Sequence, residues 1–200
     1  MVRNGEGGMS STNLVDNYSE KEGQVNGVEF YWTGHPFVDA GLAAILLIVR
    51  KNQPEELTKK DIEKAIEFAS ELYATKEWSS GYIHGMVFPN NGILMANPSM
   101  SKNRTPEKIA ERLKILYKNI PSTNENHENR CIICGRQKSA YEISQLSKDV
   151  LKSGIIRSVF SLLGTGDVNN FFPSANMKGV DVCAHCLFLT QFMPLASYRL

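Results

Sequence analysis

Two Cys-x-x-Cys pairs constrain the fold of this 200-residue chain more than any other feature of its sequence. The pairs are Cys131 with Cys134 and Cys183 with Cys186, and the chain has no further cysteine. Two such turns that face each other supply four thiolates, the tetrahedral ligand set that Zn²⁺ prefers at structural sites. We therefore expect these four cysteines to hold one structural zinc ion, although iron fits four thiolates as well.

The cysteine pattern leaves several alternatives open. Four thiolates complete the coordination of zinc, so a catalytic metal with an open position for water is not expected. Disulfides are the main competing interpretation, but nothing near the N-terminus looks like a secretory signal. We therefore expect a cytoplasmic protein with reduced thiols. A thioredoxin-like redox motif would explain only one pair, and either His127 or His185 could replace a cysteine as ligand.

The distribution of charge along the chain says more about possible partners than the overall composition does. With 42% hydrophobic and 22% charged residues, the sequence is that of an ordinary globular protein. Residues 1–100 contain 8 Lys and Arg against 13 Asp and Glu, whereas residues 101–200 contain 14 against 8. A polyanion is therefore expected to bind the second half of the chain, unless the two halves neutralise each other.

Hydrophobic periodicity and capping residues predict the secondary structure. In the first 120 residues three helices are indicated, over residues 37–50, from Thr58 through Tyr73, and from Thr105 to about Asn119. Residues 28–32 are expected to form a strand and residues 82–96 a β-hairpin. We therefore expect an α+β fold, in which a mixed helix and short-strand N-terminal domain carries an inserted or appended Cys₄ zinc-binding module.

Changes in composition suggest a division of the chain. Residues 1–27 are expected to be a flexible leader, residues 28–120 an N-terminal αβ region and residues 121–130 a linker. Residues 131–200 would form the zinc-stapled module, which contains helices over 143–151 and 155–163 and a basic Gly- and Asn-rich loop. We expect this module to continue into a C-terminal region that the sequence does not include.

One face of the helix predicted from Thr105 is basic. Arg104, Lys108 and Arg112 are four residues apart and share this face, while Lys114 and Lys118 form a second row. The face could meet phosphates. Alternatively, it is a solvated surface stabilised by ion pairs with neighbouring glutamates.

Two stretches of the chain resemble the CXXC-CXXC family of CRISPR-associated proteins. The sequence Phe-Tyr-Trp-Thr-Gly-His-Pro-Phe-Val-Asp-Ala-Gly at residues 30–41 is similar to the opening of that family. The cysteine pairs, together with Asn-Phe-Phe-Pro at residues 170–173, are similar to its middle. Members of the family are the large subunits of Cascade effector complexes in type I-B and related systems. They are longer than this chain and continue into a helical C-terminal region.

The resemblance implies a non-catalytic subunit of an RNA-guided surveillance complex in antiviral defence. Such a subunit would contact the protospacer-adjacent motif of double-stranded target DNA near the 5′ handle of the crRNA. Its partners would be the Cascade backbone and the crRNA-handle-binding subunits. Guide pairing reads the target sequence in these complexes, so the protein needs only local duplex recognition and positive charge. On physical grounds, amides and cations suited to nucleic acid are present at Arg157, Asn169, Asn170 and Lys178.

Two functions from other classes compete with this interpretation. His35 with Asp39, or His84, could belong to a catalytic set, but no spacing of a nucleophile and a base is visible, and we expect no enzyme. A zinc-stapled protein-interaction module could instead use its basic surface to bind an acidic protein without binding nucleic acid.

Overall fold

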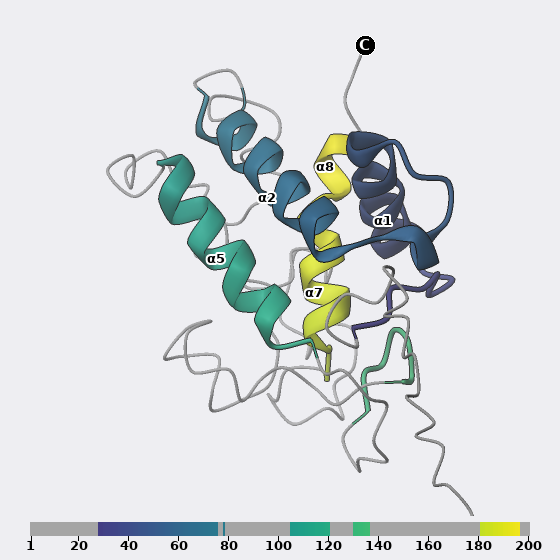
Figure 1. Ribbon diagram of the computed structural model, residues 1–200. Helices are drawn as coiled ribbons and strands as arrows, with labels where there is room; N and C mark the ends of the chain where they lie inside the picture. Colours follow the sequence, from purple (N-terminus) through teal and green to yellow (C-terminus); the bar gives the residue numbers. More distant parts are fainter. Residues whose placement is uncertain (1–27, 76–77, 79–104, 121–129, 137–180, 197–200) are drawn as a thin grey trace, which may run out of the picture.

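The computed structural model describes residues 28–75, 78, 105–120, 130–136 and 181–196, and these residues are mainly helical. The elements are α1 (Pro36–Val49), the short 3₁₀-helix η1 (Pro54–Glu56), α2 (Lys59–Ala74), α5 (Pro106–Lys118), α7 (Ala184–Thr190) and α8 (Met193–Ala196). Helices α2 and α5 run antiparallel side by side, and α1 lies beside α8 (Figure 1). Helix α7 contacts both α1 and α5, and it therefore occupies the centre of this arrangement.

The three helices predicted from periodicity and capping are confirmed to within one residue at each end. At the start of α2, the Thr58 hydroxyl accepts a hydrogen bond from the Asp61 amide at 3.3 Å, and the Asp61 carboxylate accepts one from the Thr58 amide at 2.9 Å. This reciprocal pair is the predicted capping box. At the start of α5, the Thr105 side chain accepts a hydrogen bond from the Lys108 amide, and Pro106 takes the first helical position.

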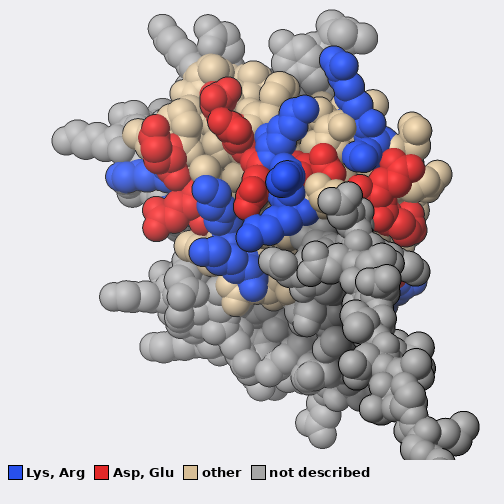
Figure 2. All heavy atoms as spheres, viewed as in Figure 1, with Lys and Arg blue, Asp and Glu red and all other residues tan. Residues whose placement is uncertain are grey.

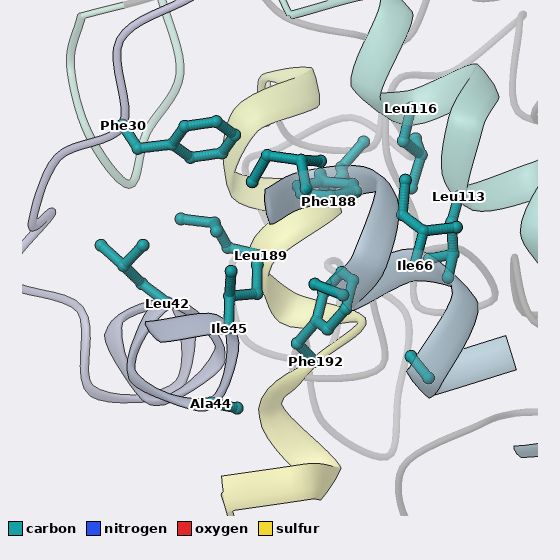
Figure 3. Packing of buried hydrophobic residues seen from close by; sticks show 14 of the residues in the cluster. Phe30, Leu42, Ala44, Ile45, Ile66, Leu113, Leu116, Phe188, Leu189 and Phe192 are labelled. Atoms are coloured by element: carbon teal, nitrogen blue, oxygen red, sulfur yellow. The ribbon is translucent and has the colours of Figure 1, made fainter. Parts of the chain in front are cut away.

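A single hydrophobic cluster contains residues from α1, α2, α5 and α7. Figure 3 shows Phe188 and Leu189 of α7, and Phe192 just after it, among side chains of the other three helices. All seven residues of α7 are buried. The described residues on both sides of the expected linker thus share one core. Because residues 121–129 lie outside the described ranges, the linker itself stays a prediction.

Helices α1 and α7 approach each other backbone to backbone at Gly41. A Cβ atom added to Gly41 would lie 1.8 Å from the carbonyl oxygen of Leu189 and 3.3 Å from the amide nitrogen of Met193. Both of these atoms belong to the backbone, so a neighbouring side chain cannot move aside to make room. Glycine is therefore required for this contact.

The expected α+β fold is wrong for the residues that the structure describes, because helices make up 66% of them and no sheet is present. Within the segment 28–32 only Val28 takes part in an isolated β-bridge, and the segment forms no strand of a sheet. Its aromatic side chains pack against helices instead. Phe30 and Tyr31 are both buried, whereas strict strand alternation would bury only one of them. The centroids of the Phe30 and Phe188 rings are 6.2 Å apart.

Several expectations fall on residues outside the described ranges. These are the leader at 1–27, the hairpin at 82–96, the helices at 143–151 and 155–163, and the Gly- and Asn-rich loop. Among the helices that are described, none has both the length and the apolar character needed to cross a membrane.

Candidate metal centre

The structure brings the four cysteine sulfurs together. Every pair of these sulfur atoms lies within 4.8 Å. The Sγ atoms of Cys131 and Cys186 are 3.8 Å apart, and those of Cys134 and Cys183 are 3.6 Å apart. Four sulfurs about 2.3 Å from a central Zn²⁺ would be about 3.8 Å from one another in a regular tetrahedron. The separations therefore match a four-thiolate metal site, and all four cysteines are free rather than paired in disulfides.

Backbone geometry fixes each of the two turns. In the first turn, the Gly135 amide donates to the Cys131 carbonyl at 2.8 Å, and Gly135 has a φ of 64°, in the left-handed region that favours glycine. In the second, Cys183 is the N-cap of α7, and its sulfur accepts a hydrogen bond from the Cys186 amide at 3.4 Å. The Ile132 amide donates to the Asp181 carbonyl at 2.7 Å, which joins the two turns directly.

The proximity of the sulfurs changes their acidity. Hydrogen bonds from Cys131, Cys183 and Cys186 hold the pKa of the Cys134 thiol well below its usual range. Hydrogen bonds with the other three cysteines raise the pKa of the Cys186 thiol far above its usual range, and the bond with Cys131 has the largest effect. Four negative charges cannot be held this close together unless a cation is present. A divalent metal bound here would remove this repulsion, because it would bind the thiolates and displace their protons.

The aromatic side chain of Tyr31 lies against the cysteine cluster. The Tyr31 hydroxyl donates a hydrogen bond to Cys134 Sγ at 3.4 Å. The Tyr31 ring stacks on the His185 ring with centroids 4.2 Å apart and planes 10° apart, and the guanidinium carbon of Arg136 lies 4.2 Å from its centroid. Sequence patterns did not predict a role for Tyr31 beside the metal site. The only indication was that Tyr31 belongs to the segment 30–41.

His185 lies between two of the cysteines in sequence but does not belong to the cluster of ligand atoms. It is completely buried, and neither of its ring nitrogens has a hydrogen-bond partner among the described residues. Burial lowers the pKa of His185 to about 4, so the ring is neutral at pH 7. With four sulfurs present, the structure gives no support for His185 as a substitute ligand. His127 lies outside the described residues.

The candidate catalytic pair His35 and Asp39 is part of a turn. The Asp39 carboxylate accepts hydrogen bonds from the Thr33 amide and hydroxyl, both at 2.8 Å, and from the Gly34 amide at 2.9 Å. These bonds fix the segment that leads into α1, where His35 is the N-cap residue. A structural role accounts for Asp39, while His84 lies outside the described ranges.

The basic residues of α5 share their surface with carboxylates. Figure 2 shows Lys and Arg intermingled with Asp and Glu on one face of the molecule. A groove between α2 and α5 is lined by both lysines of the predicted second row and by five glutamates: Lys114, Lys118, Glu63, Glu67, Glu71, Glu107 and Glu111. This arrangement favours a surface of mixed charge on that side of α5. Arg104 lies outside the described residues, as do the predicted nucleic-acid residues Arg157, Asn169, Asn170 and Lys178.

Comparisons of the chain with models of protein families, with curated proteins and with solved structures found no match.

Proposed function

We propose that Cys131, Cys134, Cys183 and Cys186 bind one structural Zn²⁺ and that the ion stabilises the helical core. The observation that carries this proposal is the pair of sulfur separations, 3.8 and 3.6 Å, which fit the edges of a tetrahedral Zn–S₄ site. The four thiolates would fill the coordination sphere of the metal and leave no position open for water or substrate. A structural role therefore fits the site better than a catalytic one.

The position of the second cysteine turn makes the site important for the whole core. Cys183 caps α7 and Cys186 lies within it, and both are completely buried. A metal that joins them to Cys131 and Cys134 holds α7 at its place between α1 and α5. Because such a site is not formed in the unfolded chain, the free energy of binding the metal adds to the free energy of folding.

Metal analysis of the purified full-length chain tests this proposal. We expect about one zinc per chain, as a closed Cys₄ site requires, and loss of the metal in Cys186→Ser. Ile132→Ser is a matched control in the first turn, because that side chain is 62% exposed and is not a ligand. If the chain instead contains about one iron, the proposed site stands but its metal is iron rather than zinc. A chain that binds neither metal contradicts it.

We further propose that the chain serves as the non-catalytic large subunit of a type I CRISPR surveillance complex. The resemblance of residues 30–41 and of the cysteine pairs to the CXXC-CXXC family supports this. The two stretches are also neighbours in space, since Tyr31 donates to Cys134 and Gly41 contacts the backbone of Leu189. The described residues that carry the resemblance, at 30–41 and at the cysteine pairs, therefore lie close together.

In this role, the protein would contact the protospacer-adjacent motif of the target DNA and the region of the crRNA 5′ handle. The excess of basic residues in the second half of the chain suits a polyanionic partner. Arg157, Asn169, Asn170 and Lys178 remain the proposed contacts with nucleic acid.

Co-purification tests the assignment to a surveillance complex. The tagged chain is purified from cells that express a type I-B CRISPR operon, and the bound RNA and proteins are then identified. Recovery of crRNA with the backbone subunits supports the proposal. Recovery of the zinc-loaded chain without RNA or these subunits contradicts it and favours the interaction module that binds no nucleic acid.

A further inference from the structure

Tyr31 makes a long-range contact with the metal site, although it belongs to neither cysteine turn. It lies in the extended segment before α1, and its hydroxyl donates to Cys134 Sγ over a separation of 103 positions in the sequence. The side chain is only 6% exposed. The hydroxyl therefore reaches the sulfur from within the protein rather than from solvent.

Two further contacts hold the Tyr31 ring in place. His185 stacks on it with nearly parallel planes, and the Arg136 guanidinium lies over it at 4.2 Å. Arg136 follows the first cysteine turn and His185 lies inside the second. Contacts of this kind are attractive and restrict the orientation of the ring. The position of the hydroxyl is thus fixed by residues adjacent to the metal ligands themselves.

Cys134 is the cysteine that most needs such support. It is partly exposed, whereas Cys131, Cys183 and Cys186 are buried. A partly exposed thiolate is open to protons, oxidants and competing chelators. A hydrogen bond donated to the sulfur stabilises the charged ligand and fixes its direction toward the metal.

We infer that Tyr31 is a positioning residue of the metal centre, which holds Cys134 in the coordination sphere and protects its sulfur from attack. This inference rests on the proposed metal site and adds a residue from outside the cysteine pairs. It also gives a physical reason why the segment at 30–41 and the cysteine turns occur in one chain. The segment supplies a hydrogen bond to Cys134 Sγ from outside both cysteine turns.

Tyr31→Phe tests the inference, because it removes the hydroxyl and retains the ring. In the full-length zinc-loaded protein we expect zinc affinity to fall about 10- to 100-fold, the range typical of hydrogen-bonding partners of metal ligands. Competition with a chelator of known affinity measures this change. Alkylation followed by mass spectrometry should show faster modification of Cys134 than in the wild type. The Co²⁺-substituted protein should show a shifted sulfur-to-metal charge-transfer band.

Tyr117→Phe is the matched control. The Tyr117 ring packs against Phe30 and Phe188 in the same aromatic cluster, and its buried hydroxyl has no hydrogen-bond partner in the part of the chain that the structure describes. We expect this variant to keep wild-type zinc affinity, alkylation rates and Co²⁺ spectrum. A purely structural role of Tyr31 would change the stability of the protein but not the charge-transfer band.

Arg136→Gln provides a second variant in case Tyr31→Phe does not fold. Arg136 is exposed at the surface, so its replacement leaves the core unchanged. We expect a change in the same direction as for Tyr31→Phe, but smaller. If wild-type protein binds zinc and the folded variants retain its affinity and spectrum, the inference is overturned. If wild-type protein binds no metal, the proposed metal site fails instead.

Discussion

The pair α2 and α5 and the region around α7 are held together in different ways. Helices α2 and α5 each begin at a threonine that caps its own helix, and each buries one face while the other carries charged residues. Helix α7 has seven residues, all buried, and begins at a cysteine of the metal site. The first region is specified mainly by interactions between residues close in sequence. The second is held by contacts with distant segments and, under the proposed function, by the metal.

Removal of the metal should have the largest effect and should separate the two regions. Apparent binding free energies of structural zinc sites are about 10–16 kcal/mol, which is as large as the stability of most domains. We therefore expect a chelator, or Cys186→Ser, to abolish cooperative thermal unfolding, as measured by near-UV circular dichroism. Far-UV signal from α2 and α5 should persist in part. Unchanged cooperative unfolding after complete removal of zinc would show that α7 does not need the metal.

Truncation of a core side chain should have the next largest effect, and it should be much larger in α7 than on the outer face of α2. Phe188 is completely buried, whereas Phe68 of α2 is 47% exposed. We expect Phe188→Ala to lower the free energy of unfolding by about 3–5 kcal/mol. Phe68→Ala serves as the control and should cost less than about 1 kcal/mol. Denaturant titration of both variants measures the difference, and equal losses would contradict the central position of α7.

The backbone contact between α1 and α7 can be tested at Gly41. Its replacement by alanine places a methyl group on the Leu189 carbonyl oxygen and should cost about 2–3 kcal/mol because α1 and α7 must move apart. Alanine usually stabilises a helix relative to glycine by about 1 kcal/mol, so a loss here has the opposite sign. Leu47→Ala in the same helix is the control, since Leu47 is 76% exposed. A stabilised Gly41→Ala variant would mean that the two helices are not in backbone contact.

A hydrogen bond links α2 to the turn after α7. The buried Tyr73 hydroxyl donates to the Gln191 carbonyl at 2.6 Å. Tyr73→Phe should lower the free energy of unfolding by about 1–3 kcal/mol, because a buried carbonyl loses a donor. Urea titration should detect this loss. Tyr117→Phe, whose hydroxyl has no partner, should be close to neutral and thus separates the hydrogen bond from the effect of removing an oxygen.

The smallest effect is expected at the cap of α2. Thr58→Ala removes both hydroxyl interactions with Asp61 and should cost about 1 kcal/mol. Thr58→Ser retains the hydroxyl and should cost less. Because the cap acts within α2, zinc affinity should remain unchanged in Thr58→Ala. A weaker metal site in this variant would show that the two regions are more tightly coupled than the contacts indicate.

The same difference explains what could be predicted from the sequence. The capping box at Thr58 and the buried positions of α5 depend on residues three or four apart, so periodicity and capping predicted both helices. The four ligands were predicted because Cys-x-x-Cys spacing is itself a local pattern. The strand expected at 28–32 was wrong because its aromatic residues pack on a helix more than 150 positions later. The contact of Tyr31 with Cys134 could not be predicted for the same reason.

The late position of α7 in the chain has a consequence for biosynthesis. The hydrogen bonds that join Tyr73 to Gln191 and Tyr31 to Cys134 span 118 and 103 positions. Closing such long loops costs entropy before the contacts they enclose are gained, which slows folding. During translation, the face of α1 that packs on α7 therefore lacks this partner until α7 has left the ribosome. The first cysteine pair likewise leaves the ribosome before the second, because Cys134 precedes Cys183 by 49 positions.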